Sequence, residues 1–246
     1  IRSKNLIMKI ILITIFISMF ALQPLMSKEN EQLDDGLNKT QENIVKIASF
    51  AAQGNLQDLT IALNNGLDSG MTINETKEVL VHLYAYCGFP RSIMGLRTLL
   101  KVLNDRKEKG LLDLWGEMAT PITDTRTKYE RGLKTLRELT KSDMNGPKPE
   151  YQLFSTEIDI FLKEHLFADI FERDVLNFSQ RELITISVIT SLGGLDPMLQ
   201  GHLNISLNVG LSPKQLQEFI MIMESTAGIE KSKTAKIILD RVLENR

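Results

Sequence analysis

The feature that most constrains this chain is that it resembles itself. When its 246 residues are compared with themselves at a shift of about 140 positions, many like residues fall in register without a gap. The matched pairs are Glu42 with Glu182, Ile44 with Ile184, Gly54 with Gly194, Leu59 with Leu199, Leu63 with Leu203, Leu67 with Leu207, Gly70 with Gly210, Glu78 with Glu218, Gly88 with Gly228 and Leu99 with Leu239. Chance supplies leucine matches, but it rarely places three glycines and two carboxylates in one frame. We therefore expect one structural unit to occur twice, over residues 28–105 and 151–246.

Capping signals and apolar runs divide each copy into helices. In the second copy, Ser179 and Glu182 are predicted to form a capping box before an apolar run to Leu192, which Gly193-Gly194 ends. The next helices are expected to span residues 196–209, 212–225 and 231–243, and in the first copy Thr72 and Glu75 form a matching capping box. No segment shows sustained period-two alternation. The predicted fold is therefore all-α, with two tandem copies of a helical unit as a pseudo-dimer in one chain.

Residues 106–150 separate the two copies and are predicted to be a linker. This stretch is charged, ends in Gly146-Pro147-Lys148-Pro149, and is expected to hold one helix over about residues 128–141. After it, apolar residues recur at helical spacing from Ile158 to Ile170, and His165 lies among them. We interpret His165 first as a histidine of the core, with a role in a substrate pocket as the alternative.

The N-terminus is predicted to be a secretory signal peptide. Lys9 is followed by an uncharged apolar run over residues 10–22, shorter than the roughly 20 residues that cross a bilayer as a helix. We expect Met8 to be the start, with cleavage near Ser27, so that residues 1–27 form the signal region. The mature protein is therefore expected to be exported, to the periplasm or beyond the cell, without a membrane segment. The single cysteine, Cys87, allows no intrachain disulfide.

The charge balance argues against a nucleic-acid partner. Lys and Arg number 29 and Asp and Glu 31, and no basic run stands out that would follow a phosphate backbone. We expect a small-molecule substrate instead.

Several segments together resemble the carboxymuconolactone decarboxylase family. In the second copy they are Phe171–Leu176, Arg181–Ile186 and Gly201–Ser212, and in the first copy Tyr86-Cys87-Gly88-Phe89-Pro90 is similar to the family's Tyr-x-Gly-x-Pro signature. This resemblance implies the helical alkylhydroperoxidase D-like fold, which is usually assembled as trimers or hexamers of units. A fused pair would stand in for a dimer, so we expect a homo-oligomer, with a trimer of this chain as the specific expectation.

The resemblance also implies two kinds of chemistry. Peroxidase members use a Cys-x-x-Cys pair ahead of the histidine, because a hydroperoxide needs an attacking thiolate and a resolving thiol. Leu195 and Met198 occupy those positions here. Decarboxylase members hold a small lactone acid and move protons, for which a histidine and a carboxylate suffice. The favoured function is thus acid-base catalysis on a small carboxylated or lactone-like substrate, with His202 and Glu182 as catalytic residues and neither cofactor nor metal.

Each of these assignments has an alternative. Glu182 would then only close the capping box, and His202 would be a packed histidine. Counting helical turns from Gly193 and Asp196 puts the two side chains at different heights, so we expect a water or ligand to bridge them. Cys87 is either a small buried hydrophobe or the lone catalytic thiol of a thiol peroxidase of the peroxiredoxin type.

The two copies have also diverged. Ala62 stands where the second copy has His202, which leaves a non-catalytic binding protein as a third hypothesis. The signature around Tyr86 is intact in the first copy alone, so each half is expected to complete the other's site. Tyr84 and Tyr86 are the expected substrate-binding tyrosines, together with His165.

Overall fold

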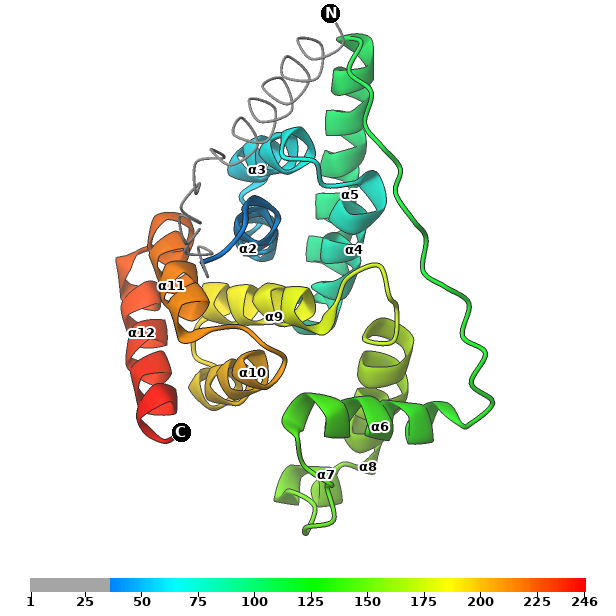
Figure 1. Ribbon diagram of the computed structural model, residues 1–246, viewed down its shortest axis with the longest axis vertical. Helices are drawn as coiled ribbons and strands as arrows, with labels where there is room; N and C mark the ends of the chain where they lie inside the picture. The colour runs from blue at the N-terminus through cyan, green and yellow to red at the C-terminus, as the bar shows by residue number, and fades with distance from the viewer. Residues whose placement is uncertain (1–35) are drawn as a thin grey trace, which may run out of the picture. The chain divides into compact units, whose positions relative to one another are not determined.

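The regular elements of the chain are helices throughout the part that the computed structural model describes, residues 36–246 (Figure 1). The predicted all-α class is confirmed. No helix in this range is long and apolar enough to cross a membrane. The predicted signal region, residues 1–27, lies outside the described residues.

Two groups of four helices follow the same order along the chain. The first group comprises α2 (Lys39–Gln53), α3 (Leu56–Asp68), α4 (Ile73–His82) and α5 (Tyr84–Glu108). The second comprises α9 (Phe178–Leu192), α10 (Asp196–Asn208), α11 (Pro213–Ala227) and α12 (Ile229–Glu244).

A kink in the backbone recurs at matching glycines of the two groups. Gly88 interrupts α5 at φ 82° and ψ 161°, and Gly228 separates α11 from α12 at φ 94° and ψ 160°. Only glycine adopts this backbone conformation readily. The shared order and the shared kink agree with two copies of one unit, which stays an inference from the sequence.

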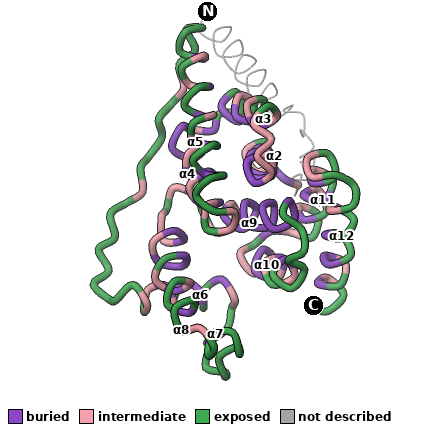
Figure 2. Tube along the Cα trace, turned by 180° about the vertical axis from the view of Figure 1, so that it is seen from behind, coloured by how far each residue is buried: buried purple, intermediate pink, exposed green. Residues whose placement is uncertain are grey.

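Helices α2 and α9 form the centre of the core. Every residue of α9 from Arg181 to Ser191 is buried, and Figure 2 shows this helix in purple among the others. The two central helices touch through buried serines, since Ser49 Oγ lies 2.9 Å from Ser191 Oγ. Each fully buried Leu or Ile in this core contributes about 1.5–3 kcal/mol to stability. A helix buried on all sides gives fixed positions to the polar side chains that it carries.

A further set of helices falls between the two groups in the sequence. It consists of α6 (Lys128–Thr140), α7 (Glu150–Phe154), α8 (Thr156–Ile160) and the π-helix η1 (Phe161–Ile170). The helix predicted within the linker is confirmed as α6. This helix packs closely along η1, because a Cβ added to Gly132 would lie 1.8 Å from the carbonyl oxygen of Lys163.

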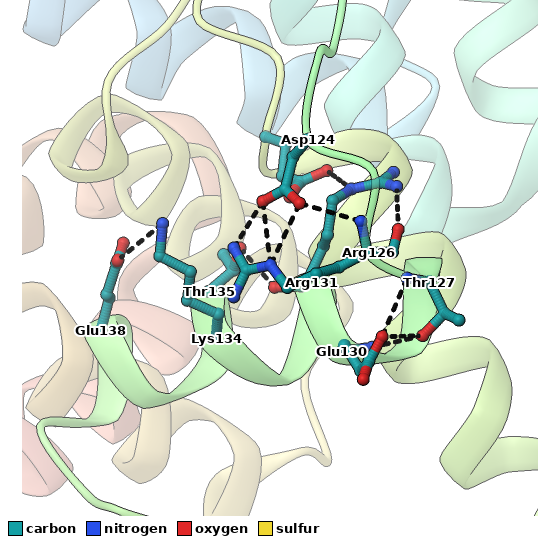
Figure 3. Close-up of polar contacts among 9 residues, drawn as sticks. Asp124, Arg126, Thr127, Glu130, Arg131, Lys134, Thr135 and Glu138 are labelled. Atoms are coloured by element: carbon teal, nitrogen blue, oxygen red, sulfur yellow. Dashed lines mark hydrogen bonds and ion pairs between the residues drawn. The ribbon is translucent and has the colours of Figure 1, made fainter.

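Polar contacts fix the start of α6 (Figure 3). Thr127 is the N-cap, and Glu130 Oε2 accepts hydrogen bonds from the Thr127 backbone nitrogen at 2.9 Å and its hydroxyl at 2.8 Å. Arg126 forms an ion pair with Asp124, and Arg131 donates to the Arg126 carbonyl oxygen at 3.1 Å. Arg131 also reaches the end of η1, where its Nε lies 3.0 Å from Glu172 Oε2. The start of α6 is therefore held to the chain that follows η1.

Two local predictions are wrong. The cap of α9 is Asn177 with Gln180, not Ser179 with Glu182, because the helix begins at Phe178 and Ser179 already lies within it. His165 is half exposed rather than part of the core. Its prediction assumed α-helical periodicity, whereas this stretch is a π-helix with wider turns. The box formed by Thr72 with Glu75 is confirmed, and Ser212 with Gln215 forms a further box at the start of α11.

Candidate functional site

His202 and Glu182 are in direct contact. His202 Nδ1 lies 2.9 Å from Glu182 Oε2, the carboxylate is fully buried, and the imidazole is 16% exposed. The expected bridging water or ligand is therefore wrong. The prediction compared heights along parallel axes, but α10 is foreshortened in Figure 1 while α9 runs across the view, so the helices cross. At such a crossing, side chains at different distances from the connecting turn meet.

Glu182 does not cap α9, so its buried carboxylate has another role. Its carboxylate does not close the end of α9, and Oε1 forms no hydrogen bond within the described residues. Burying a carboxylate with one hydrogen bond costs free energy of folding, and a functional role would explain why it is kept there. Its hydrogen bond to Nδ1 orients the imidazole of His202 and leaves Nε2 as the nitrogen available for other partners.

Tyr86 of the first copy lies against His202 of the second. Their ring centroids are 5.8 Å apart and the rings are nearly perpendicular, at 83°. The Tyr86 hydroxyl is buried without a hydrogen-bond partner in the described part of the chain. Burial raises the pKa of Tyr86 far above its ordinary value, and the negative charge of Glu182 raises it further. The phenol therefore stays protonated and is a hydrogen-bond donor at any physiological pH.

A cavity of about 380 Å³ opens beside these residues. His202, Leu195 and Met198 line it from α10 and its start, and Tyr86 lines it from α5. Helices α6, α7 and η1, with the chain between α6 and α7, supply most of the remaining wall, namely Leu136, Met144, Pro149, Tyr151, Gln152, Leu162, Lys163, Leu166 and Phe167. Leu195 and Met198, at the positions of the peroxidase cysteines, thus present apolar side chains to the cavity. A larger hollow of about 590 Å³ near Thr120 and Asn177 contains none of the predicted site residues.

A buried ionic network that the sequence analysis missed lies beside the site. Arg181 is fully buried, and its Nη2 donates to Glu78 Oε1 at 2.8 Å. Glu78 also accepts a bidentate pair from Arg173, at 2.9 Å for both its Nε and Nη2. Burial opposes ionisation of Glu78, but hydrogen bonds from the two arginines outweigh it and lower its pKa. The matched Glu78–Glu218 pair and a lone arginine in an apolar helix were the signals for this network.

The same network holds His82 in one tautomer. Arg181 Nη1 lies 3.1 Å from His82 Nδ1, which must accept because a guanidinium only donates. His82 Nε2 therefore carries the proton and donates to Thr185 Oγ1 at 3.0 Å, while Thr185 donates to the Arg181 carbonyl oxygen. Burial, the Arg181 charge and the His202 charge lower the pKa of His82 well below its ordinary value. His82 is thus a neutral, fixed side chain 5.6 Å from the Tyr86 ring, measured between centroids.

The other predicted site residues lie apart from the cavity lining. Cys87 is partly buried and its Sγ donates to the Leu83 carbonyl oxygen at 3.2 Å. Burial raises the pKa of the Cys87 thiol to about 11, although the Arg91 charge acts in the other direction. Tyr84 stacks on Phe89 at 4.6 Å, and His165 Nδ1 lies 3.2 Å from Asp169 Oδ2. The structure therefore brings together His202, Glu182 and Tyr86, but not Cys87, Tyr84 or His165.

A comparison with family sequence models matches the part of the chain that carries His202 and Glu182. Residues 157–241 match the sequence model of the carboxymuconolactone decarboxylase family. The chain is similar to a 4-carboxymuconolactone decarboxylase of Acinetobacter baylyi, with 26% identity over 119 residues, which cover 48% of this chain and 88% of the relative. It is also similar to the nitrosuccinic acid decarboxylase npaB of Metarhizium robertsii, with 27% identity over 75 residues, which cover 30% of this chain and 52% of that relative. Residues 157–241 of this chain are therefore similar to the carboxymuconolactone decarboxylase family.

Proposed function

We propose that this protein is a decarboxylase that acts by acid-base catalysis on a small carboxylated or lactone-like acid. The observation that carries the proposal is the buried Glu182 carboxylate bonded to His202 at the wall of an apolar cavity. Such a pair supplies a proton carrier whose orientation is fixed before the substrate binds. Two relatives whose names describe decarboxylases of small acids support the same reaction type.

The proposed step uses this chain's own side chains. The bond between the substrate carbon and its carboxylate breaks, CO2 leaves, and the electron pair stays on that carbon. His202, as imidazolium, donates its Nε2 proton to this carbon, and solvent returns a proton to the imidazole. Glu182 stabilises the imidazolium through Nδ1, and the Tyr86 phenol donates a hydrogen bond to the oxygen that gains charge on the substrate.

The alternative of a thiol peroxidase receives less support from the geometry. A peroxidatic thiol attacks as the thiolate, and a thiol with a pKa near 11 is almost fully protonated at neutral pH. Cys87 also lies outside the residues that line the cavity. The proposed function therefore assigns Cys87 no catalytic step.

Two variants test the proposal. His202→Ala is expected to lower turnover of a panel of lactone acids by about 100-fold or more, the usual contribution of a general acid, whereas Cys87→Ser keeps it. CO2 release and hydroperoxide consumption are measured for both variants, with circular dichroism as the control for folding. Loss of activity in Cys87→Ser together with full activity in His202→Ala would refute the acid-base assignment.

Export and assembly also stay proposals. We propose that the chain is exported after removal of residues 1–27 and assembles as a trimer, on the strength of the apolar segment after Lys9 and of the family resemblance. Intact-mass measurement of the native protein tests the first, and light scattering in solution tests the second.

A further inference from the structure

The cavity beside His202 has an unusual set of charges. Most of its lining is apolar, and the described residues that line it include no aspartate and no glutamate. Apart from two tyrosines, its ionisable side chains are His202 and Lys163. A largely apolar cavity that a lysine and a histidine line, with no carboxylate among its described lining residues, favours an anionic ligand with an apolar body.

Lys163 belongs to a cluster that has more positive than negative charge. Its Nζ forms an ion pair with Asp159 Oδ1, and the two side chains are 6% and 4% exposed. Asp159 Oδ2 already accepts from Lys148 Nζ at 2.9 Å and from the Tyr129 hydroxyl at 2.9 Å. Burial opposes ionisation of Asp159, but these three donors outweigh it and lower its pKa to about 2. Two ammonium groups thus share one ionised carboxylate.

Within the described residues, the ammonium group of Lys163 forms one hydrogen bond, to Asp159. It carries three N–H groups, of which one faces Asp159, and its nitrogen lies 5.2 Å from the centroid of the Tyr129 ring. A buried ammonium costs several kcal/mol unless its donors are used. Lys163 also lies on η1, and π-helical turns occur frequently at functional sites.

We propose that Lys163 anchors a carboxylate of the substrate that the reaction leaves in place. This inference rests on the proposed function and assigns Lys163 as a residue that positions the substrate. An ammonium group stabilises a carboxylate but not neutral CO2. Binding the departing group would therefore stabilise the ground state and slow its loss. The carboxylate held by Lys163 is thus the one that stays, and the reacting carbon lies toward His202.

Gln152 is a second polar side chain in the wall of the cavity that Lys163 lines. It lines the same cavity, and its Nε2 donates to the Tyr151 hydroxyl at 3.0 Å. Both side chains come from the short helix α7, which the predicted two-copy organisation places at the start of the second copy. The anchor and the proton carrier therefore come from different elements, η1 with α7 on one side and α10 on the other.

The test is a binding measurement that needs no turnover. Benzoate and benzamide serve as probes, because they have nearly the same shape and differ in charge. Their affinities for the full chain are measured by calorimetry at low salt. Lys163→Met is expected to weaken benzoate binding by about tenfold or more and to leave benzamide unchanged, while Lys163→Arg keeps most of the affinity.

Lys148→Met is the matched control. Lys148 pairs with the same Asp159 but is about half exposed and does not line the cavity, so its removal is expected to change benzoate affinity by less than about threefold. Equal losses for both probes in Lys163→Met, equal effects of the two lysine variants, or no preference of the native protein for benzoate overturns the proposal. His202→Ala separates the two inferences, because it is expected to abolish turnover while benzoate still binds. Inactive His202→Ala with unaltered binding in Lys163→Met would leave the proposed function standing and remove the anchor.

Discussion

Glu78 is the residue whose replacement best tests the reasoning about the buried network. Its carboxylate balances Arg181, which is fully buried, and Arg173, which is 38% exposed at its side chain. Glu78→Gln keeps the size of the side chain but leaves the Arg181 guanidinium in the core without a counter-charge. Removing one partner of a buried ion pair costs about 3–5 kcal/mol. For a chain of this size, that loss corresponds to a fall in melting temperature of about 6–20 °C.

The pH dependence gives an independent check on the same variant. Because the folded-state pKa of Glu78 lies below its ordinary value of 4.5, its stabilising effect is complete above 4.5 and is lost as the pH falls through the lowered pKa. The free energy of unfolding is therefore expected to fall more steeply with acidification in the native protein than in Glu78→Gln. Chemical denaturation over a series of pH values measures both curves.

A matched carboxylate provides the control. Glu218 occupies the corresponding position of the second copy, and its Oε2 accepts from the Leu37 backbone nitrogen at 2.6 Å. Among the described residues, the buried arginines Arg106 and Arg181 pair with other carboxylates, so Glu218→Gln is expected to cost about 1–2 kcal/mol. Equal losses in the two variants, or a Glu78→Gln loss below about 1 kcal/mol, would show that Arg181 is not stabilised by this carboxylate.

Two further perturbations follow from the packing. Gly132→Ala is expected to lower the melting temperature by about 2–12 °C, because its Cβ meets the Lys163 carbonyl oxygen at 1.8 Å. Gly201→Ala is the control in thermal denaturation, because its Cβ meets no atom within 4 Å and alanine has a higher helix propensity than glycine. Equal melting temperatures for the two variants would contradict the close packing of α6 on η1. His82→Gln tests the neutral histidine: the lowered pKa means that native stability is full above the ordinary value of 6.5 and falls below it, by at most about 1.4 kcal/mol per pH unit. Urea denaturation from about pH 7 to about pH 5 should show a smaller decline in this variant, and an unchanged decline would refute the assignment of His82 as neutral.

The sequence predicted most of the helices but not the angles at which they pack. Capping boxes such as Thr72 with Glu75 predicted where helices begin, and turn glycines predicted where they end. Both signals act within a few residues of the chain. The contact between Glu182 and His202 depends on the angle between α9 and α10, which no local signal encodes. Residue periodicity also failed at His165, where the helix changes its pitch.

The wall of the cavity was the least predictable part. Charged composition and Gly146-Pro147 indicated a linker, yet Leu136, Met144 and Pro149 of this stretch line the cavity. Lys163 had no signal of its own, because a lysine in an amphipathic stretch is normally a solvated side chain. Its burial depends on Asp159, four residues earlier, and on Tyr129 from another helix.

If the predicted repeat holds, its two copies differ at the positions of the candidate site. Glu42, the counterpart of Glu182, is partly exposed and forms ion pairs with Lys39 at 3.0 Å and Lys46 at 3.3 Å. Ala62 stands in place of His202, so the first copy has no proton carrier for its carboxylate to orient. The first copy instead contributes Tyr86, whose protonated phenol lies against the histidine of the second. The candidate site therefore takes its tyrosine from one predicted copy and its histidine and carboxylate from the other.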